Sequence, residues 1–264
     1  GSTSVSPRSR DASIVVTAPA RSTVFARLGA FAAACALAGT GMVAGIVATT
    51  GGAAAAAPAS GLAGDATPTL SAGTPGTVSV VAQSAPNNGR VAIIVRNDTD
   101  GPVNNVRVAA TATRADGGAV TSANTKALVP ATLAPGAYGL AVLDFRKRGI
   151  DLDAQVSFDV RSTKAASGTD PQLLEVSELT RSAPSSGKVA QTLTFTVANP
   201  TKRAVRGPVS ATVMCFNEAG KPVNLTTARV RRAGLGAGKD ASVHVGLAEL
   251  CPTALVGARA SSSA

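Results

Sequence analysis

The chain has 264 residues, which is room for two domains of ordinary size plus an additional segment. Its formal net charge of +10 favours either an anionic partner or a solvated basic surface. The basic residues are scattered and aromatic residues make up only 3% of the chain, so we expect no nucleic-acid binding, which requires basic clusters and stacking platforms.

The first 50 residues consist of a basic tail and an uncharged apolar run. Residues 1–27 are rich in Ser, Thr and Arg, a composition typical of disorder. Residues 28–50 carry no charge and are long enough to cross a bilayer of about 30 Å, which takes roughly 20 helical residues. Because the basic residues precede this run, the N-terminus is expected in the cytoplasm and the rest of the chain outside it.

Two interpretations of residues 28–50 stay open. A retained transmembrane helix fits the length of the run, and its Gly and Ala content favours close helix packing. A cleaved signal sequence fits the small residues Ala57-Pro58-Ala59, with cleavage after Ala59. Residues 51–76, rich in Ala, Gly and Pro, are predicted to form a flexible linker.

The remainder of the chain contains one pattern twice. Residues 84–92 read SAPNNGRVA, and residues 182–190 read SAPSSGKVA. After each copy come an alternating apolar run, an Asn-x-Thr turn, a second alternating run, a Gly-containing turn and a Leu-x-x-Gly element. The repeat predicts two modules of one fold, at residues 77–160 and 174–264, joined by a short polar linker at 161–173.

Alternation within each module predicts β-strands. In the first module, the odd-numbered residues from Val91 to Val95 point to one face of a strand, and the even-numbered residues from Ala92 to Arg96 point to the other. The inner face of the next strand is predicted to carry Val106, Val108, Ala110 and Ala112. The corresponding residues of the second module are Val209, Ala211, Val213 and Cys215. About seven short strands per module predict an all-β chain of two tandem immunoglobulin-like β-sandwiches, preceded by the N-terminal helix.

The repeated order of elements resembles a known family. The Asn-x-Thr turn, the Ala/Val strand, the segment FNEAGKPV at residues 216–223 and the Leu-x-x-Gly turn are similar to the FxLYD-type immunoglobulin-like domains of bacterial cell-envelope proteins. The resemblance covers both modules, with residues 214–218 nearest to the Phe-x-Leu-Tyr-Asp signature. It implies a non-enzymatic module at the cell surface and assigns no catalytic residue.

Cys215 and Cys251 are the cysteines that follow the apolar run, and both belong to the second module. A disulfide suits an exported domain, with two reduced core thiols or a metal site as the alternatives. A metal site is disfavoured because His244 is the one histidine of the chain, and a surface or edge position on a strand is the simpler interpretation of that residue. We expect a disulfide between Cys215 and Cys251 and neither a metal nor a cofactor.

Two charged segments have two interpretations each. Residues 97–101 and 151–153 concentrate oxygen atoms of the kind that calcium binds, but Asn and Asp also stabilise tight turns by bonding to the backbone. Arg146, Lys147 and Arg148 form the one compact basic triplet, which is either a contact for an anionic partner or a solvated loop. The sequence contains no recognisable catalytic triad, phosphate loop or zinc motif, so no enzymatic activity is expected.

These observations predict an envelope protein that residues 28–50 hold in the membrane, with both modules on the extracytoplasmic side. Cleavage after Ala59 would instead make it a secreted protein. We expect a protein-protein interaction or scaffolding role, such as that of an accessory subunit in a membrane or surface assembly. The alternative is a secreted or wall-associated adhesin that binds glycan or an anionic polymer, either wall polymer or lipid, through a basic face; salt weakens such binding.

Overall fold

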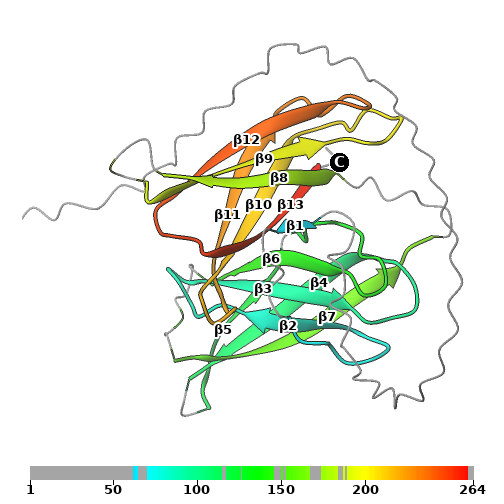
Figure 1. Cartoon of the computed structure of the whole chain (residues 1–264). Coiled ribbons are helices and arrows are strands. Elements are labelled where there is room, and N and C mark those ends of the chain that lie inside the picture. Colours follow the sequence, from blue (N-terminus) through cyan, green and yellow to red (C-terminus); the bar gives the residue numbers. More distant parts are fainter. Residues whose placement is uncertain are drawn as a thin grey trace, which may run out of the picture.

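A computed structural model describes residues 62–64, 70–114, 117–125, 127–145, 150, 153–166, 174–183, 187 and 189–260. Within these residues the chain forms thirteen β-strands in antiparallel sheets and no helix (Figure 1). The prediction of an all-β fold is confirmed for this part of the chain. The predicted basic tail at 1–27 and the predicted apolar helix at 28–50 lie outside the described residues.

No helix among the described residues is long and apolar enough to span a membrane.

The first module consists of two three-stranded sheets that enclose an apolar core. One sheet has the order β2-β3-β6 and the other the order β5-β4-β7. The strands are β2 (Val78–Gln83), β3 (Arg90–Asn97), β4 (Val103–Thr113), β5 (Ala119–Asn124), β6 (Tyr138–Asp144) and β7 (Gln155–Lys164). The core contains Val106, Val108, Ala110 and Ala112 of β4, the four residues predicted for its inner face, together with Val91, Ile93 and Val95, one of the two alternating sets of β3. Strand β7 continues to Lys164, four residues past the predicted module boundary and into the predicted linker at 161–173.

The turn between β2 and β3 explains the first copy of the repeated motif. Asn88 and Gly89 have φ angles of 48° and 71°. Asn87 and Arg90 exchange two backbone hydrogen bonds of 2.8 and 2.9 Å across them. A two-residue hairpin turn of this type needs positive φ at both central positions, which an Asn-Gly pair tolerates best. The motif therefore fixes where β3 begins.

The second module has the same topology. Its sheets have the orders β8-β9-β12 and β13-β10-β11, which repeat β2-β3-β6 and β7-β4-β5 strand for strand. The strands are β8 (Glu175–Ser182), β9 (Gln191–Ala198), β10 (Val209–Phe216), β11 (Pro222–Arg231), β12 (Asp240–Leu247) and β13 (Thr253–Ala260). Its core includes Leu193, Phe195 and Val197 from β9 together with Val209, Ala211, Val213 and Cys215 from β10. In the described residues each module has six strands of its own, where the turn spacing suggested about seven.

The predicted flexible linker at 51–76 contains a strand, so that prediction is wrong for residues 62–64. Strand β1 (Leu62–Gly64) pairs antiparallel with β13, with Ala63 opposite Val256. It thus joins the outer edge of a sheet in the second module although it precedes the first module in the chain (Figure 1). The segment was missed because three residues of an Ala- and Gly-rich tract are too few to show alternation.

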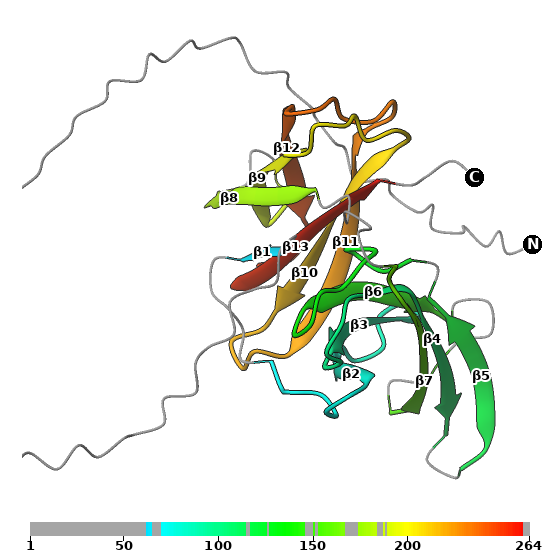
Figure 2. The ribbon, with the colours of Figure 1, turned by 90° about the vertical axis from the view of Figure 1, so that its right-hand side faces the viewer.

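The two modules pack against each other through a third apolar cluster. The outer face of the β2-β3-β6 sheet lies against the outer face of the sheet that contains β10, β11 and β13 (Figure 2). The first module contributes Ala92, Ile94, Tyr138 and Leu140, and the second contributes Met214, Phe216 and Leu255, with Leu62 from β1 beside them. We call this cluster the module interface. An apolar face of each module is consequently buried against the other.

Candidate functional site

His244 forms a polar contact between two strands of the β8-β9-β12 sheet of the second module. It lies on β12 directly opposite Thr194 on β9, and Thr194 Oγ1 is 2.9 Å from His244 Nδ1. The histidine is half-buried on the face that points away from the core. No group of three or more His, Cys, Asp or Glu side chains among the described residues could hold a metal ion. The geometry describes a cross-strand polar contact, which matches the simpler of the two interpretations of this residue.

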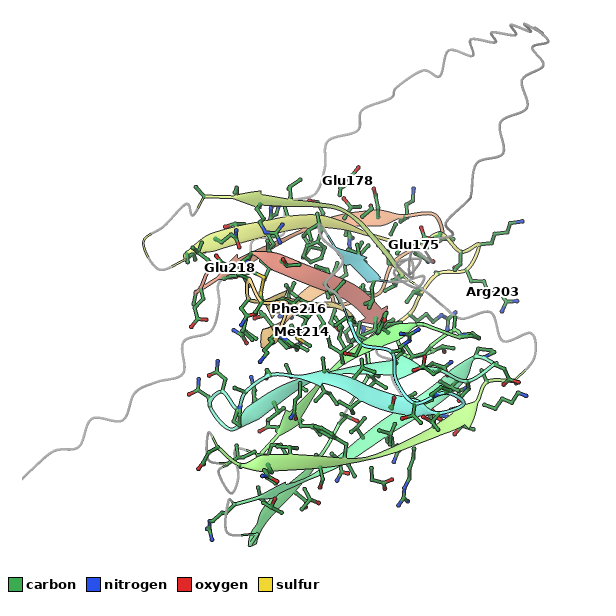
Figure 3. All side chains as sticks on the ribbon, turned by 60° about the horizontal axis from the view of Figure 1, so that its bottom comes forward. Glu175, Glu178, Arg203, Met214, Phe216 and Glu218 are labelled. Atoms are coloured by element: carbon green, nitrogen blue, oxygen red, sulfur yellow. A yellow bond between two sulfur atoms is a disulfide. The ribbon has the colours of Figure 1, made fainter. Side chains whose placement is uncertain are left out.

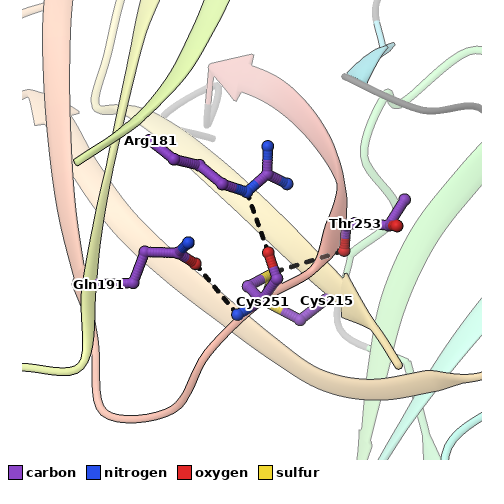
Figure 4. Close-up of a disulfide and its surroundings, with 5 residues drawn as sticks. All are labelled: Arg181, Gln191, Cys215, Cys251 and Thr253. Atoms are coloured by element: carbon purple, nitrogen blue, oxygen red, sulfur yellow. Dashed lines mark hydrogen bonds between the residues drawn. A yellow bond between two sulfur atoms is a disulfide. The ribbon is translucent and has the colours of Figure 1, made fainter. Parts of the chain in front are cut away.

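Cys215 and Cys251 form a disulfide, the pairing that the sequence suggested (Figure 4). It joins the end of β10 to the loop before β13, with the two Cα atoms 5.3 Å apart. Cys251 is also bonded through its backbone, because its N–H donates to Gln191 Oε1 at 3.0 Å and its carbonyl accepts from Arg181 Nε at 3.0 Å. Burial lowers the pKa of the Arg181 guanidinium below its ordinary value. These bonds fix the loop between β12 and β13 to both sheets of the second module.

The buried side chain of Asn97 connects two segments of the first module by hydrogen bonds. Its side chain is fully buried, and its Nδ2 donates to the carbonyls of Gly101 at 2.9 Å and Leu133 at 3.0 Å. Its Oδ1 accepts from the backbone N–H and the hydroxyl of Thr99, at 3.1 and 2.7 Å. The asparagine therefore ties the turn after β3 to the Leu-x-x-Gly segment before β6, and its oxygen is committed to the turn itself.

Asn199 repeats this arrangement in the second module. It donates to Arg203 O at 2.8 Å and to Leu235 O at 3.1 Å, and it accepts from Thr201 at the same two distances as in the first module. The Asn-x-Thr and Leu-x-x-Gly elements of the sequence are thus two halves of one hydrogen-bonded unit. For residues 97–101, this is the turn interpretation, and Asp98 forms an ion pair of 2.9 Å with Arg96. The predicted segment 151–153 lies mostly outside the described residues.

The module interface is a feature of the structure that alternation alone did not reveal. Ile94 and Leu140 of the first module and Met214 and Phe216 of the second are buried to within 1% of complete. Figure 3 shows Met214 and Phe216 on the side of the second module that faces the first, with Glu178 on the opposite side. At its rim, Arg96 lies 5.2 Å from the centre of the Tyr138 ring and donates from Nη1 to the Tyr138 hydroxyl at 3.1 Å.

A signal for this interface exists in the sequence. All five residues from Val91 to Val95 are apolar, whereas a strand with one exposed face alternates. The same holds for the run from Val213 to Phe216 at the end of β10. Continuous apolar runs of this kind mark strands that are buried on both faces.

A shallow groove lies at one end of the interface, between the repeated turn of the first module and the β10–β11 hairpin of the second. Two hollows of about 190 and 310 Å³ make it up. Its walls carry Ser84, Asn87, Asn88 and Arg90 on one side and Asn217, Lys221, Val223 and Asn224 on the other. We call these residues the intermodule groove. Small-molecule sites commonly measure about 300 to 1,000 Å³ and enclose most of their ligand. The two hollows lie at or below the lower end of this range and are open to solvent, so the groove suits one end of a larger partner better than a buried small ligand.

The predicted basic contact at Arg146, Lys147 and Arg148 lies outside the described residues, in the segment between β6 and β7. The cations that the structure places at the groove are Arg90 and Lys221, and Arg90 Nε is 3.9 Å from Asp144 Oδ2. The groove was not predicted from the sequence because it is formed by two segments more than 120 residues apart, which only the packing of the modules brings together.

The sequence matches no family model, and no curated protein matches it at a significant level. Among solved structures, a transglutaminase of the red sea bream is similar with a TM-score of 0.20 and 15% sequence identity. The match covers 71% of this chain and 29% of the transglutaminase chain. A similarity of this size carries no argument about function.

Proposed function

We propose that the chain is a non-enzymatic interaction or scaffolding module of the cell envelope, built from two tandem immunoglobulin-like β-sandwiches of the type that the FxLYD resemblance suggests. The support for the fold is that the second module repeats the strand orders of the first, with β8-β9-β12 matching β2-β3-β6 and β13-β10-β11 matching β7-β4-β5. In the second module, β1 fills the edge position where a seventh strand of such a sandwich would lie.

The observation that carries the proposal is the module interface. It joins the two β-sandwiches into one body through buried apolar side chains, including Ile94 and Phe216. A scaffold benefits from this rigidity, because a partner that contacts both modules does not have to order them first. The intermodule groove, which both modules line, is the surface that exists only in the joined form.

In this proposal, residues 28–50 anchor the chain in the membrane and place both modules outside the cytoplasm. The partners are envelope proteins, and the chain is an accessory subunit of a membrane or surface assembly. Cleavage after Ala59 would release the same two modules as a secreted protein.

The test is purification of the full-length chain at native expression level in mild detergent, with mass spectrometry of every protein recovered in near-stoichiometric amount. We expect a fixed set of membrane or surface proteins that persists at high salt. The groove variant Asn87→Glu is expected to reduce their recovery, and the matched control Ser242→Glu, on the far face of the second module, is expected to leave it unchanged. A chain recovered alone under all conditions would contradict the proposal.

A second candidate is an adhesin that binds glycan or an anionic wall polymer. The observation in its favour is the lining of the groove, where four asparagines lie with Arg90 and Lys221. Amide groups and cations are suitable hydrogen-bonding partners for sugar hydroxyls and acidic groups. Retention on purified wall polymer that disappears as the salt concentration rises would favour this candidate over the first.

A further inference from the structure

Equivalent edges of the two modules differ in whether a strand covers them. In the second module, β13 pairs with β10 on one side and with β1 on the other. Its counterpart in the first module, β7, pairs with β4 on one side, and no described strand pairs with its other edge. An uncovered edge presents unpaired N–H and C=O groups that can accept another strand.

The apolar core reflects this difference. The inward residues of β13, Ala254, Val256 and Ala258, are buried to 2% exposure or less. The corresponding residues of β7, Val156, Phe158 and Val160, are only partly buried, although they pack against the core of the first module. The first module therefore leaves its core partly open at the position where β1 closes the second.

The polar face of β7 indicates which strand would fit. Asp159 and Arg161 lie two residues apart on that face, with side chains 60% and 83% exposed and Arg161 Nε 3.1 Å from Asp159 Oδ2. In an antiparallel pair of two identical strands with the two-fold axis at Val160, each Asp159 lies opposite the partner's Arg161. Moving the axis to Asp159 or to Arg161 would instead place like charges opposite each other, which is unfavourable.

We propose that two copies of this chain associate through their β7 edges, antiparallel and with the two-fold axis at Val160. Such a contact is self-complementary, as a two-fold symmetric dimer requires. It joins the β5-β4-β7 sheets of two copies into one continuous sheet and covers the open side of both cores. The inference goes beyond the proposed function, because the edges would pair whatever else the chain binds.

The test is sedimentation equilibrium of the full-length chain in mild detergent, with charge reversals at the two positions. Asp159→Arg places Arg opposite Arg, and Arg161→Asp places Asp opposite Asp, twice in each dimer. We expect each single variant to raise the dimer dissociation constant at least about tenfold, because opposite charges become like charges at two symmetric positions. The matched control, Arg229→Asp on the exposed face of β11, is expected to leave the constant unchanged.

Two further samples identify the register. The double variant Asp159→Arg/Arg161→Asp restores both opposite-charge pairs and is expected to dimerise like the native chain. A mixture of the two single variants is expected to form a heterodimer, because one strand then carries two Arg and the other two Asp. A native chain that stays monomeric at all concentrations, or a dimer that both single reversals leave intact, would overturn the proposal, and so would failure of the mixture to associate.

Discussion

The outer faces of β3 and β9 occupy equivalent positions in the two copies of the repeat, yet they differ in both composition and environment. On β3 the outward residues Ala92 and Ile94 are apolar and buried in the module interface. Their counterparts on β9, Thr194 and Thr196, lie on an open face, where Thr196 donates to Glu178 at 2.9 Å. Two copies of one fold thus keep the same inner face and diverge on the outer one.

The partner sheets show the reverse difference. Met214 and Phe216 on β10 are buried in the interface, and the corresponding residues of β4 are Thr111 and Thr113. The first module therefore offers one apolar sheet face and the second module offers the other. Contacts of this head-to-tail kind would continue indefinitely if every copy carried both apolar faces. The threonines on β9 and β4 end the stack at two modules.

The largest effect is expected at the centre of the interface. Phe216→Ala should lower the free energy of unfolding by about 3 to 5 kcal/mol, because it removes a fully buried aromatic side chain and leaves a cavity. Its counterpart Thr113→Ala should change stability by less than about 0.5 kcal/mol, as is usual for surface substitutions. Urea unfolding of both variants measures the contrast, and equal effects would contradict the account of the interface.

The disulfide is a second difference between the two modules. Cys215→Ala/Cys251→Ala should destabilise the second module by about 3 to 4 kcal/mol, because the two cysteines are separated by 36 residues and the bond restricts the unfolded chain. The first module contains no cysteine and should keep its own core. Hydrogen exchange read separately for β9 and β3 is the measurement. Loss of protection in β3 equal to that in β9 would mean that the modules unfold as one unit.

A substitution on β3 can give the interface the composition of the exposed outer face of β9. Ile94→Thr gives β3 the residue that β9 has at that position and should cost about 2 to 3 kcal/mol, because it buries a hydroxyl and removes apolar contact. The reverse change, Thr196→Ile, should be close to neutral for stability and should expose an apolar patch. Thermal unfolding compares the two variants. A stability loss for Thr196→Ile as large as that for Ile94→Thr would contradict the assignment of the two faces.

Among the substitutions expected to destabilise the chain, the smallest loss of stability is expected at β1. Leu62→Ala should cost about 2 kcal/mol, at the low end for a buried leucine, because the strand has only three residues and sits at the rim of the interface. Hydrogen exchange at Val256 and its neighbours on β13 should accelerate, while that on β7 should not change. Unchanged exchange on β13 would show that β1 does not hold this edge.

The sequence predicted those parts of the structure that repeat with a short period or recur in both copies. Alternation separated the two faces of β3 and assigned the inner face of β4, from Val106 to Ala112. The repeated Asn-x-Thr pattern predicted the turns in which Asn97 and Asn199 lie. The interface was harder to predict. An apolar residue on the outer face of a strand, such as Ile94, indicates that this face is buried, but it does not indicate which other segment covers it. Strand β1 and the intermodule groove depend on contacts between distant segments, which no local pattern encodes.

The central claim is that the two modules form one body through the interface, and a distance measured between them tests it most directly. Spin labels are attached to Thr111→Cys on β4 and Arg229→Cys on β11. The native disulfide stays intact, and Cys35, the third cysteine of the sequence, is replaced by Ser so that it takes no label. Electron-electron double resonance then reports the separation of the modules. We predict one narrow distance distribution that broadens when Ile94→Thr and Phe216→Ala are added. A broad distribution in the chain that retains Ile94 and Phe216 would contradict the account.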